Sequence, residues 1–290
     1  MKTDWHIHTT ASDGKYAPAE IVRLAFAEGF SQIAISDHDS LNGLHEIRSE
    51  LSLPSMFVLP AVEFSVNVYD SSSKKNEVHI LGYGLNPLNE ELNDCLERLR
   101  KTRVTRFYEM IKKANELGFL ISEEEAEAVL EKNTAPGRRH LADILVAKEY
   151  FSVDEVFAKY LNSGKPGYVS RFKFNLEETC RLIQNNGGIA ILAHPYEISS
   201  KEVRESLIRS ELFDGIESFH PSHGENESEY LLEQCRIYNK YASGGSDYHD
   251  GESGRALNFP KKIGEFYPPS EKIKAFIEWA YESPNGIKTG

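Results

Sequence analysis

The sequence predicts an α/β fold, a barrel of strands interrupted by a helical insertion. Three observations support this. Short apolar runs alternate with segments of helical period, the interiors of these runs are almost entirely apolar, and one long stretch contains only helical patterns. Strands that alternate with helices form parallel βαβ units, and strands buried on both faces read as continuous apolar runs. A chain of 290 residues is long enough to build one such domain with its insertion.

Seven segments are predicted as strands. Each is a short apolar run that ends in polar, catalytic-looking residues: TDWHIH (3–8), QIAISDHD (32–39), MFVLPAVEFSV (56–66), EVHILGYGL (77–85), GIAILAHP (188–195), GIESFHP (215–221) and YASGGSDYHD (241–250). Buried strands in this number, separated by helices, are typical of a closed barrel.

Helices are predicted between these strands. The segment 18–30 has Pro18 in its first turn and Gly29 at its end. The segment 175–188 begins with a capping box, in which Asn175 precedes Glu178. The tail after about Glu282 is expected to be loose.

The stretch after residue 87 breaks the alternation and contains only helical patterns. Helices are expected at Leu88–Leu117, at Glu123–Lys132 and in two further segments, 138–150 and 153–161. The last follows Ser152, with Glu155 in capping-box position. We therefore divide the chain into a first barrel part (1–87), a helical insertion that caps the barrel mouth (88–168) and a second barrel part (169–290).

Composition narrows the classes of partner. The net charge of −12 argues against a broad basic footprint for duplex DNA, although metal ions could invert the local charge for a small anionic substrate. No apolar run is long enough for a membrane span, so we expect a cytoplasmic protein with no membrane contact. Cys95, Cys180 and Cys235 have neither metal nor disulfide spacing and are expected to be buried small hydrophobes.

Residues that can bind metal recur at the ends of the predicted strands. They are Asp4, His6, His8, His38, Glu63, His194, Asp247 and His249, with His79 inside the fourth strand. Each motif alone also fits a structural role, such as a hydrogen-bonded histidine or a helix N-cap. Their repeated position favours a shared site, because the carboxyl ends of barrel strands carry the active site.

These motifs resemble those of the PHP (polymerase and histidinol phosphatase) superfamily. The segments that carry the resemblance are DWHIHTTASDG, SDHDSLNG, AVEFS, EVHILGY, AHP and SGGSDYH, in that order. The resemblance covers residues 1 to about 90 and about 165 to 260, and it implies a distorted (β/α)7 TIM-like barrel.

The resemblance also implies a centre of two to three divalent metal ions. One ion would be held by His6, His8, Glu63 and Asp247, a second by Glu63 as a bridge with His79 and His194, and a third by Asp13, His38 and His249. Asp4 is expected to orient a ligand histidine. Imidazole and carboxylate ligands without thiolates suit Mn²⁺, Fe²⁺ or Zn²⁺.

The insertion resembles one subgroup of the superfamily. GRRHLADILV and YLNSGKPGYVSR are similar to segments of 3',5'-nucleoside bisphosphate phosphatases, AMP-active phosphoesterases and a 5'-to-3' exoribonuclease, with Arg139 in place of a proline. Arg138, His140 and Lys165 are expected to bind a substrate phosphate, although the arginines could also be solvated residues near a helix start. His223 would bind phosphate or protonate the leaving group, whereas His220 is expected to be structural and His45 to lie on the surface.

The sequence therefore predicts hydrolysis of a phosphate monoester of a nucleotide, with trimming of short single-stranded RNA from the 5' end as a related activity. The attacking group would be a hydroxide bridging two ions, with Glu63 holding both ions and Arg138 neutralising charge on the phosphoryl oxygens. Two alternatives remain open. One is a histidinol-phosphate phosphatase, and the other is a non-catalytic, metal-stabilised module that binds nucleic acid.

Overall fold

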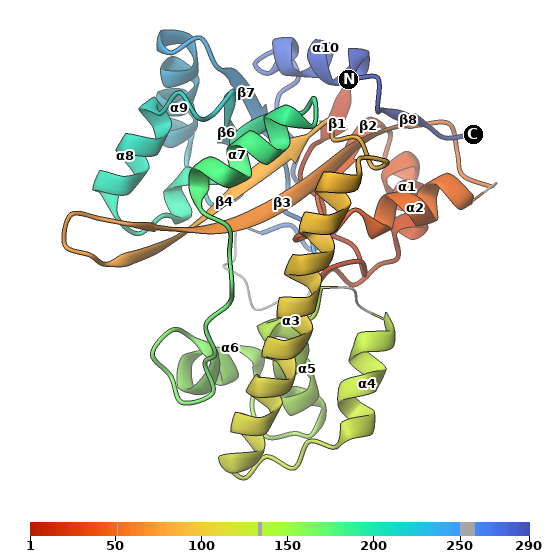
Figure 1. The fold of residues 1–290 in the computed structure, drawn as a ribbon. Coiled ribbons are helices and arrows are strands. Elements are labelled where there is room, and N and C mark those ends of the chain that lie inside the picture. Colours follow the sequence, from red (N-terminus) through yellow and green to blue (C-terminus); the bar gives the residue numbers. More distant parts are fainter. Residues whose placement is uncertain (51, 133–134, 250–258) are drawn as a thin grey trace.

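The computed structural model describes residues 1–290 apart from residues 51, 133–134 and 250–258 (Figure 1). Its strands are β1 (Lys2–Asp4), β2 (Phe30–Ile35), β3 (Phe57–Tyr69), β4 (Lys75–Tyr83), β5 (Ile189–Leu192), β6 (Gly215–Phe219), β7 (Tyr241–Gly244) and β8 (Ile287–Lys288).

Strands β1 to β7 follow one another in the sheet in chain order. The segments that follow the first and last of them also meet, because Ile7 and Tyr248 form a parallel bridge. The amide of His8 donates a hydrogen bond to the carbonyl of Tyr248 at 2.9 Å. This is the neighbour order that a seven-stranded barrel would have, and the predicted α/β class is confirmed.

The expected pattern of parallel βαβ units does not hold at β4. This strand pairs antiparallel with both β3 and β5, because β3 and β4 form a hairpin closed by residues 70–74. Asp70 Oδ1 accepts the amides of Ser72 and Lys74 in this turn, at 3.0 and 2.9 Å. A parallel crossover needs about a dozen residues or more, so a connection this short can only return antiparallel.

Six helices of at least eight residues surround the sheet in the described parts of the two barrel segments. They are α1 (Pro18–Ala27), α2 (Asn42–Ser49), α7 (Leu176–Asn185), α8 (Lys201–Arg209), α9 (Glu225–Ile237) and α10 (Lys274–Glu282). The predicted helix ends are confirmed: Asn175 Oδ1 accepts the amide of Glu178 at 2.8 Å, and Gly29 follows α1 with a φ of +79°. Cys180 and Cys235 are buried as expected, while Cys95 is only partly buried.

The insertion forms a separate lobe of helices below the sheet in Figure 1. Its elements are α3 (Glu90–Glu116), α4 (Glu123–Lys132), α5 (Arg138–Ala147) and α6 (Val153–Val156), which continues as a π-helical turn, η1 (Phe157–Leu161). The lobe has its own apolar cluster, which includes Phe107, Met110, Leu141, Leu145 and Val156. Among the described residues of 88–168 none is in a strand, and the exact domain boundaries stay a prediction.

The expectation of a loose C-terminal tail is wrong. Strand β8 pairs antiparallel with β3 at Phe57 and Val58, and the amide of Thr289 donates to the carbonyl of Met56 at 3.0 Å. Strand β4 pairs only with residues 61–69 of β3, so the first residues of β3 have a free edge there. The tail covers that edge, which would otherwise expose unpaired backbone groups.

Of the helices in the described chain, none has the length and apolar character needed to cross a membrane.

Candidate metal centre

The first group of the centre is built on the segment that follows β1. Because the bridge at Ile7 keeps this segment extended, His6 and His8 project to the same side and are fully buried. Their Nε2 atoms lie 3.2 Å apart. Nε2 of His8 is 3.2 Å from both Glu63 Oε2 and Asp247 Oδ1, and Nε2 of His6 is 3.6 and 3.4 Å from the same two atoms. Two imidazoles and two carboxylates therefore face one point.

The second group shares Glu63 with the first. Glu63 Oε1 lies 2.7 Å from Nδ1 of His79 and 2.9 Å from Nε2 of His194. These two ring nitrogens are themselves 3.3 Å apart. The two oxygens of Glu63 thus face different groups, which is the arrangement that a bridging carboxylate requires. His79 reaches this position because β4 runs antiparallel and places it opposite Ser65, near the middle of the hairpin.

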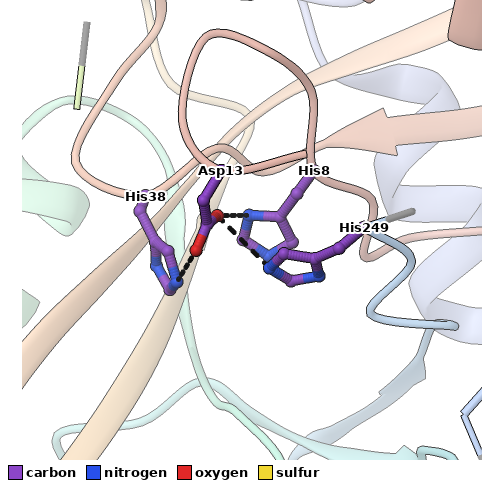
Figure 2. A group of neighbouring side chains, drawn as sticks. All are labelled: His8, Asp13, His38 and His249. Atoms are coloured by element: carbon purple, nitrogen blue, oxygen red, sulfur yellow. Dashed lines mark ion pairs between the residues drawn. The ribbon is translucent and has the colours of Figure 1, made fainter. Parts of the chain in front are cut away.

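The third group surrounds Asp13 and is looser. Figure 2 shows this side chain between His38 on one side and the rings of His8 and His249 on the other. Asp13 Oδ1 lies 3.3 Å from Nε2 of His249 and 3.7 Å from Nδ1 of His8, and its Oδ2 lies 3.9 Å from Nε2 of His38. The structure adds His8 to the three residues that the sequence assigned to this group.

This donor set fits divalent metal ions. In each of the three groups the candidate ligand atoms lie within 4.8 Å of one another. Burial opposes ionisation of Glu63, but the facing rings of His79, His38 and His6 outweigh it and hold the pKa of this carboxyl well below its usual range. An ionised carboxylate among converging imidazole nitrogens is the environment that Zn²⁺, Mn²⁺ or Fe²⁺ prefers.

Asp4 supports the main chain beside the centre. Its Oδ1 accepts the amides of His6 at 3.2 Å and of Ser246 at 2.9 Å. Asp4 thus contacts the candidate ligand His6 through its main chain and not through its ring. The residue that contacts the His6 ring from behind is Glu217 in β6, at 2.9 Å from Nδ1. The sequence analysis missed Glu217, and the available signal was a charged residue inside an otherwise apolar strand, GIESF.

A cavity of about 420 Å³ opens beside the second and third groups. The centre contributes Asp13, His38, His79 and His249 to its wall, and the insertion contributes Arg103, Arg106, Arg138 and Arg139. Arg171 and Lys173, on the segment that returns from the insertion to the barrel, complete a cationic side. The insertion therefore faces the centre across this cavity.

Two carboxylates anchor part of this cationic side. Asp39 Oδ2 lies 2.8 Å from Nε and 2.5 Å from Nη2 of Arg103, and 3.5 Å from Nη1 of Arg171. Glu77 Oε1 lies 2.7 Å from Nζ of Lys173 and 3.7 Å from Nη2 of Arg171.

The anchoring carboxylates do not offset all of the positive charge. Burial, together with repulsion from Arg171, Arg138 and Arg103, lowers the pKa of Arg106 to about 9. Burial also lowers the pKa of Lys173 to about 7, against the attraction of Glu77. An anion in the cavity would relieve this repulsion.

Of the predicted phosphate-binding residues, Arg138 lines the cavity and the other three do not. His140 is buried, and its Nδ1 accepts the amide of Gly137 at 3.0 Å at the start of α5. Lys165 is exposed outside the cavity wall. His223 packs against Tyr196 and His220, with ring centroids 5.4 Å from each. Burial, reinforced by His220, lowers the pKa of His223 to about 3, so this ring is neutral near pH 7. His45 is exposed, as expected.

The sheet order and the buried histidine–carboxylate clusters define an α/β protein with side chains that could bind metal. Its family is also clear from comparison with known proteins. The chain belongs to the PHP domain family, whose model matches residues 4–163. The resemblance found in the sequence motifs is thereby confirmed.

Similar proteins act on phosphate esters. A 3',5'-nucleoside bisphosphate phosphatase of Chromobacterium violaceum is 31% identical over 90% of this chain and 92% of its own length. The 5'-3' exoribonuclease Rnm of Escherichia coli K12 is 32% identical over 90% of both chains. A solved structure from Bifidobacterium adolescentis, named as a candidate metal-dependent phosphoesterase, is 25% identical and superposes with a TM-score of 0.77 over 95% of both chains. The predicted phosphoester hydrolase class is confirmed.

Proposed function

We propose that this chain hydrolyses a phosphate monoester of a nucleotide, such as a 3',5'-nucleoside bisphosphate or AMP, with trimming of short 5'-phosphorylated RNA as a related activity. One observation carries the proposal: a cavity with a cationic wall opens directly onto the histidine–carboxylate centre. Its volume of about 420 Å³ lies within the usual range for small-ligand sites. The names of the similar phosphatase and exoribonuclease support a nucleotide substrate.

The residues that would hold two to three divalent ions, Mn²⁺, Fe²⁺ or Zn²⁺, form the three groups described above. They are His6, His8, Glu63 and Asp247; Glu63, His79 and His194; and Asp13, His38 and His249 with His8. When bound, such ions supply Lewis acidity toward a phosphoryl oxygen and toward water.

The cationic wall would bind and orient the substrate. Arg138 and Arg106 come from the insertion and Lys173 from the segment that follows it, so phosphate oxygens in the cavity would meet several cationic donors. Donors already placed along the cavity would stabilise negative charge that develops on the phosphoryl oxygens. His223 is not assigned a role in this step, because it does not line the cavity.

A phosphate-release panel tests this proposal. The full chain with Mn²⁺ is assayed against adenosine 3',5'-bisphosphate, AMP, histidinol phosphate and short 5'-phosphorylated RNA. We expect release from one or more of the nucleotide substrates and none from histidinol phosphate. Release from histidinol phosphate alone would favour the histidinol-phosphate phosphatase alternative. Bound metal without hydrolysis of any ester would instead support a non-catalytic module.

A further inference from the structure

One buried carboxylate behind the centre contacts residues of two different groups. Glu217 lies in β6 and is fully buried. Its Oε1 is 2.9 Å from Nδ1 of His6, and its Oε2 accepts the amide of His194 at 2.8 Å. His6 belongs to the first proposed ion site and His194 to the second.

The contact with His6 sets which ring nitrogen faces the centre. Nε2 of His6 faces His8, Glu63 and Asp247, so it is the atom available to an ion. Nδ1 must then carry the ring proton and donate it to Glu217, because an ionised carboxylate can only accept. A carboxylate behind a ligand histidine fixes the orientation of the ring and increases its basicity.

The contact with His194 holds an unusual stretch of backbone. His194 has a φ of +23° and a ψ of +62°, which non-glycine residues rarely adopt. Such a conformation persists only where the surroundings impose it. The hydrogen bond from its amide to Glu217 is one such constraint, and Nε2 of the same residue reaches Glu63 at 2.9 Å.

An ion held by His6, Glu217 and His220 is the competing interpretation, since ligand atoms of these three residues also lie close together. The hydrogen bonds of His220 argue against it. Nδ1 of His220 accepts the amide of Ser222 at 3.2 Å, so in the neutral ring the proton is on Nε2. That atom lies 3.5 Å from Asp247 Oδ2. To bind an ion through Nε2, His220 would have to carry its proton on Nδ1 and lose the hydrogen bond from the Ser222 amide.

We propose that Glu217 is a positioning residue that supports two ion sites at once, through the His6 ring and the His194 backbone. The inference rests on the proposed metal ligands. It predicts that loss of the Glu217 carboxylate weakens metal binding even though Glu217 is itself not a ligand.

The Glu217→Gln variant tests this role with little change in shape. Both partners of Glu217 are donors, so the amide nitrogen of glutamine would face one of them. We expect metal affinity to fall by about 10- to 100-fold. Asp214→Asn is the matched control, because Asp214 also links strands β5 and β6 but at their opposite ends. There its Oδ2 accepts the amide of Ala190 at 2.8 Å and Nε2 of Gln184 at 3.1 Å.

The measurement is Mn²⁺ and Zn²⁺ affinity of the metal-stripped full chain, by competition with a chromophoric chelator, alongside unfolding midpoints with and without metal. A purely structural role would lower the midpoint of Glu217→Gln equally in both conditions and leave its affinity within about twofold of wild type, which would overturn the proposal. Asp214→Asn should behave in this way.

A second variant, Glu217→Asp, tests the same role if Glu217→Gln does not fold. Glu217→Asp keeps the charge but is too short to reach both partners, so its affinity should also fall, and an unchanged affinity would again overturn the role. A wild-type chain that binds neither metal would overturn the proposed function itself. If the wild-type chain binds metal and the Glu217 variants bind it with the same affinity, only the role of Glu217 is overturned.

Discussion

At the scale of a single side chain, Glu63 is the carboxylate that two groups of the centre share. Its Oε1 lies 2.7–2.9 Å from nitrogens of His79 and His194, and its Oε2 lies 2.9–3.6 Å from nitrogens of His38, His8 and His6. An uncharged amide at this position would offer a single acceptor and could not bridge two cations.

We expect Glu63→Gln to lower phosphate release on the order of 100-fold or more, because direct ligands matter at least as much as the residues behind them. Metal content should fall by at least one ion per chain. Phosphate release and elemental analysis of the purified variant check this expectation. Glu233→Gln, which alters an exposed pair with Arg236 on α9, is the control. Retained activity together with full metal content would contradict the bridging role.

Lys173 should make substrate binding depend on pH. Because burial lowers its pKa to about 7, the side chain is charged below that pH and loses its charge as the pH rises through it. The groups that face it are Glu77, which favours the charged form, and Arg171, which disfavours it; Asp39 acts more weakly, in the same direction as Glu77.

We therefore expect KM for a nucleotide substrate to increase about threefold to tenfold between pH 6 and pH 8.5, as one charge-assisted contact is lost. In Lys173→Arg the charge persists, so this part of the increase should disappear. Steady-state kinetics across this range, on both proteins, provide the measurement. Equal pH profiles would show that another group titrates.

At the level of helices and strands, Asp39 joins the insertion to the barrel. It follows β2 and contacts Arg103 of α3 and Arg171 of the returning segment. One carboxylate therefore binds both the segment that enters the insertion and the segment that leaves it. Without it, two buried cations would lose their shared counter-charge.

Asp39→Asn should raise KM about tenfold, with a smaller effect on kcat, because the cationic wall would be less well placed. Hydrogen exchange should increase in α3 and in residues 169–173, while metal content stays unchanged. Asn175→Ala is the control: loss of the α7 N-cap should lower the free energy of unfolding by about 1 kcal/mol and leave KM unaltered. A change in kcat alone would contradict a role in placing the insertion.

For the molecule as a whole, the centre joins segments that precede and follow the helical insertion in the chain. The proposed ligands follow β1, β2, β5 and β7 or lie within β3 and β4. Metal that binds only the folded chain must stabilise it, by about 2.7 kcal/mol when free metal exceeds Kd by 100-fold.

Chelation should therefore lower the midpoint of thermal unfolding by several degrees, and added Mn²⁺ or Zn²⁺ should restore it. Calorimetry of the metal-free and reloaded chain measures the shift. Mg²⁺ serves as a comparison, because it prefers oxygen ligands and should restore the midpoint less well than metals that accept imidazole. Identical midpoints in all conditions would contradict a metal centre.

Much of the fold was predictable from local patterns. The helices beginning at Pro18 and Leu176 follow from apolar periodicity and from end signals such as the pair Asn175 and Glu178, which act between near neighbours in the chain. The residues of the centre could be anticipated from the order of their motifs, because these motifs recur where predicted strands end.

Long-range geometry accounts for what the patterns did not reveal. The pairing of β8 depends on which edge of β3 remains free, and no local pattern encodes an edge. The antiparallel course of β4 follows instead from the short connection at residues 70–74, which the predicted strands 56–66 and 77–85 did not reveal because both strands extend beyond their apolar runs. The roles of Glu217 and of the cations around Asp39 follow from contacts between segments far apart in the chain. The role of a buried charge depends on the side chains that it contacts, and the sequence alone does not show these contacts. Residue types and their order thus indicated the chemistry, whereas the directions of the strands set which atoms face one another.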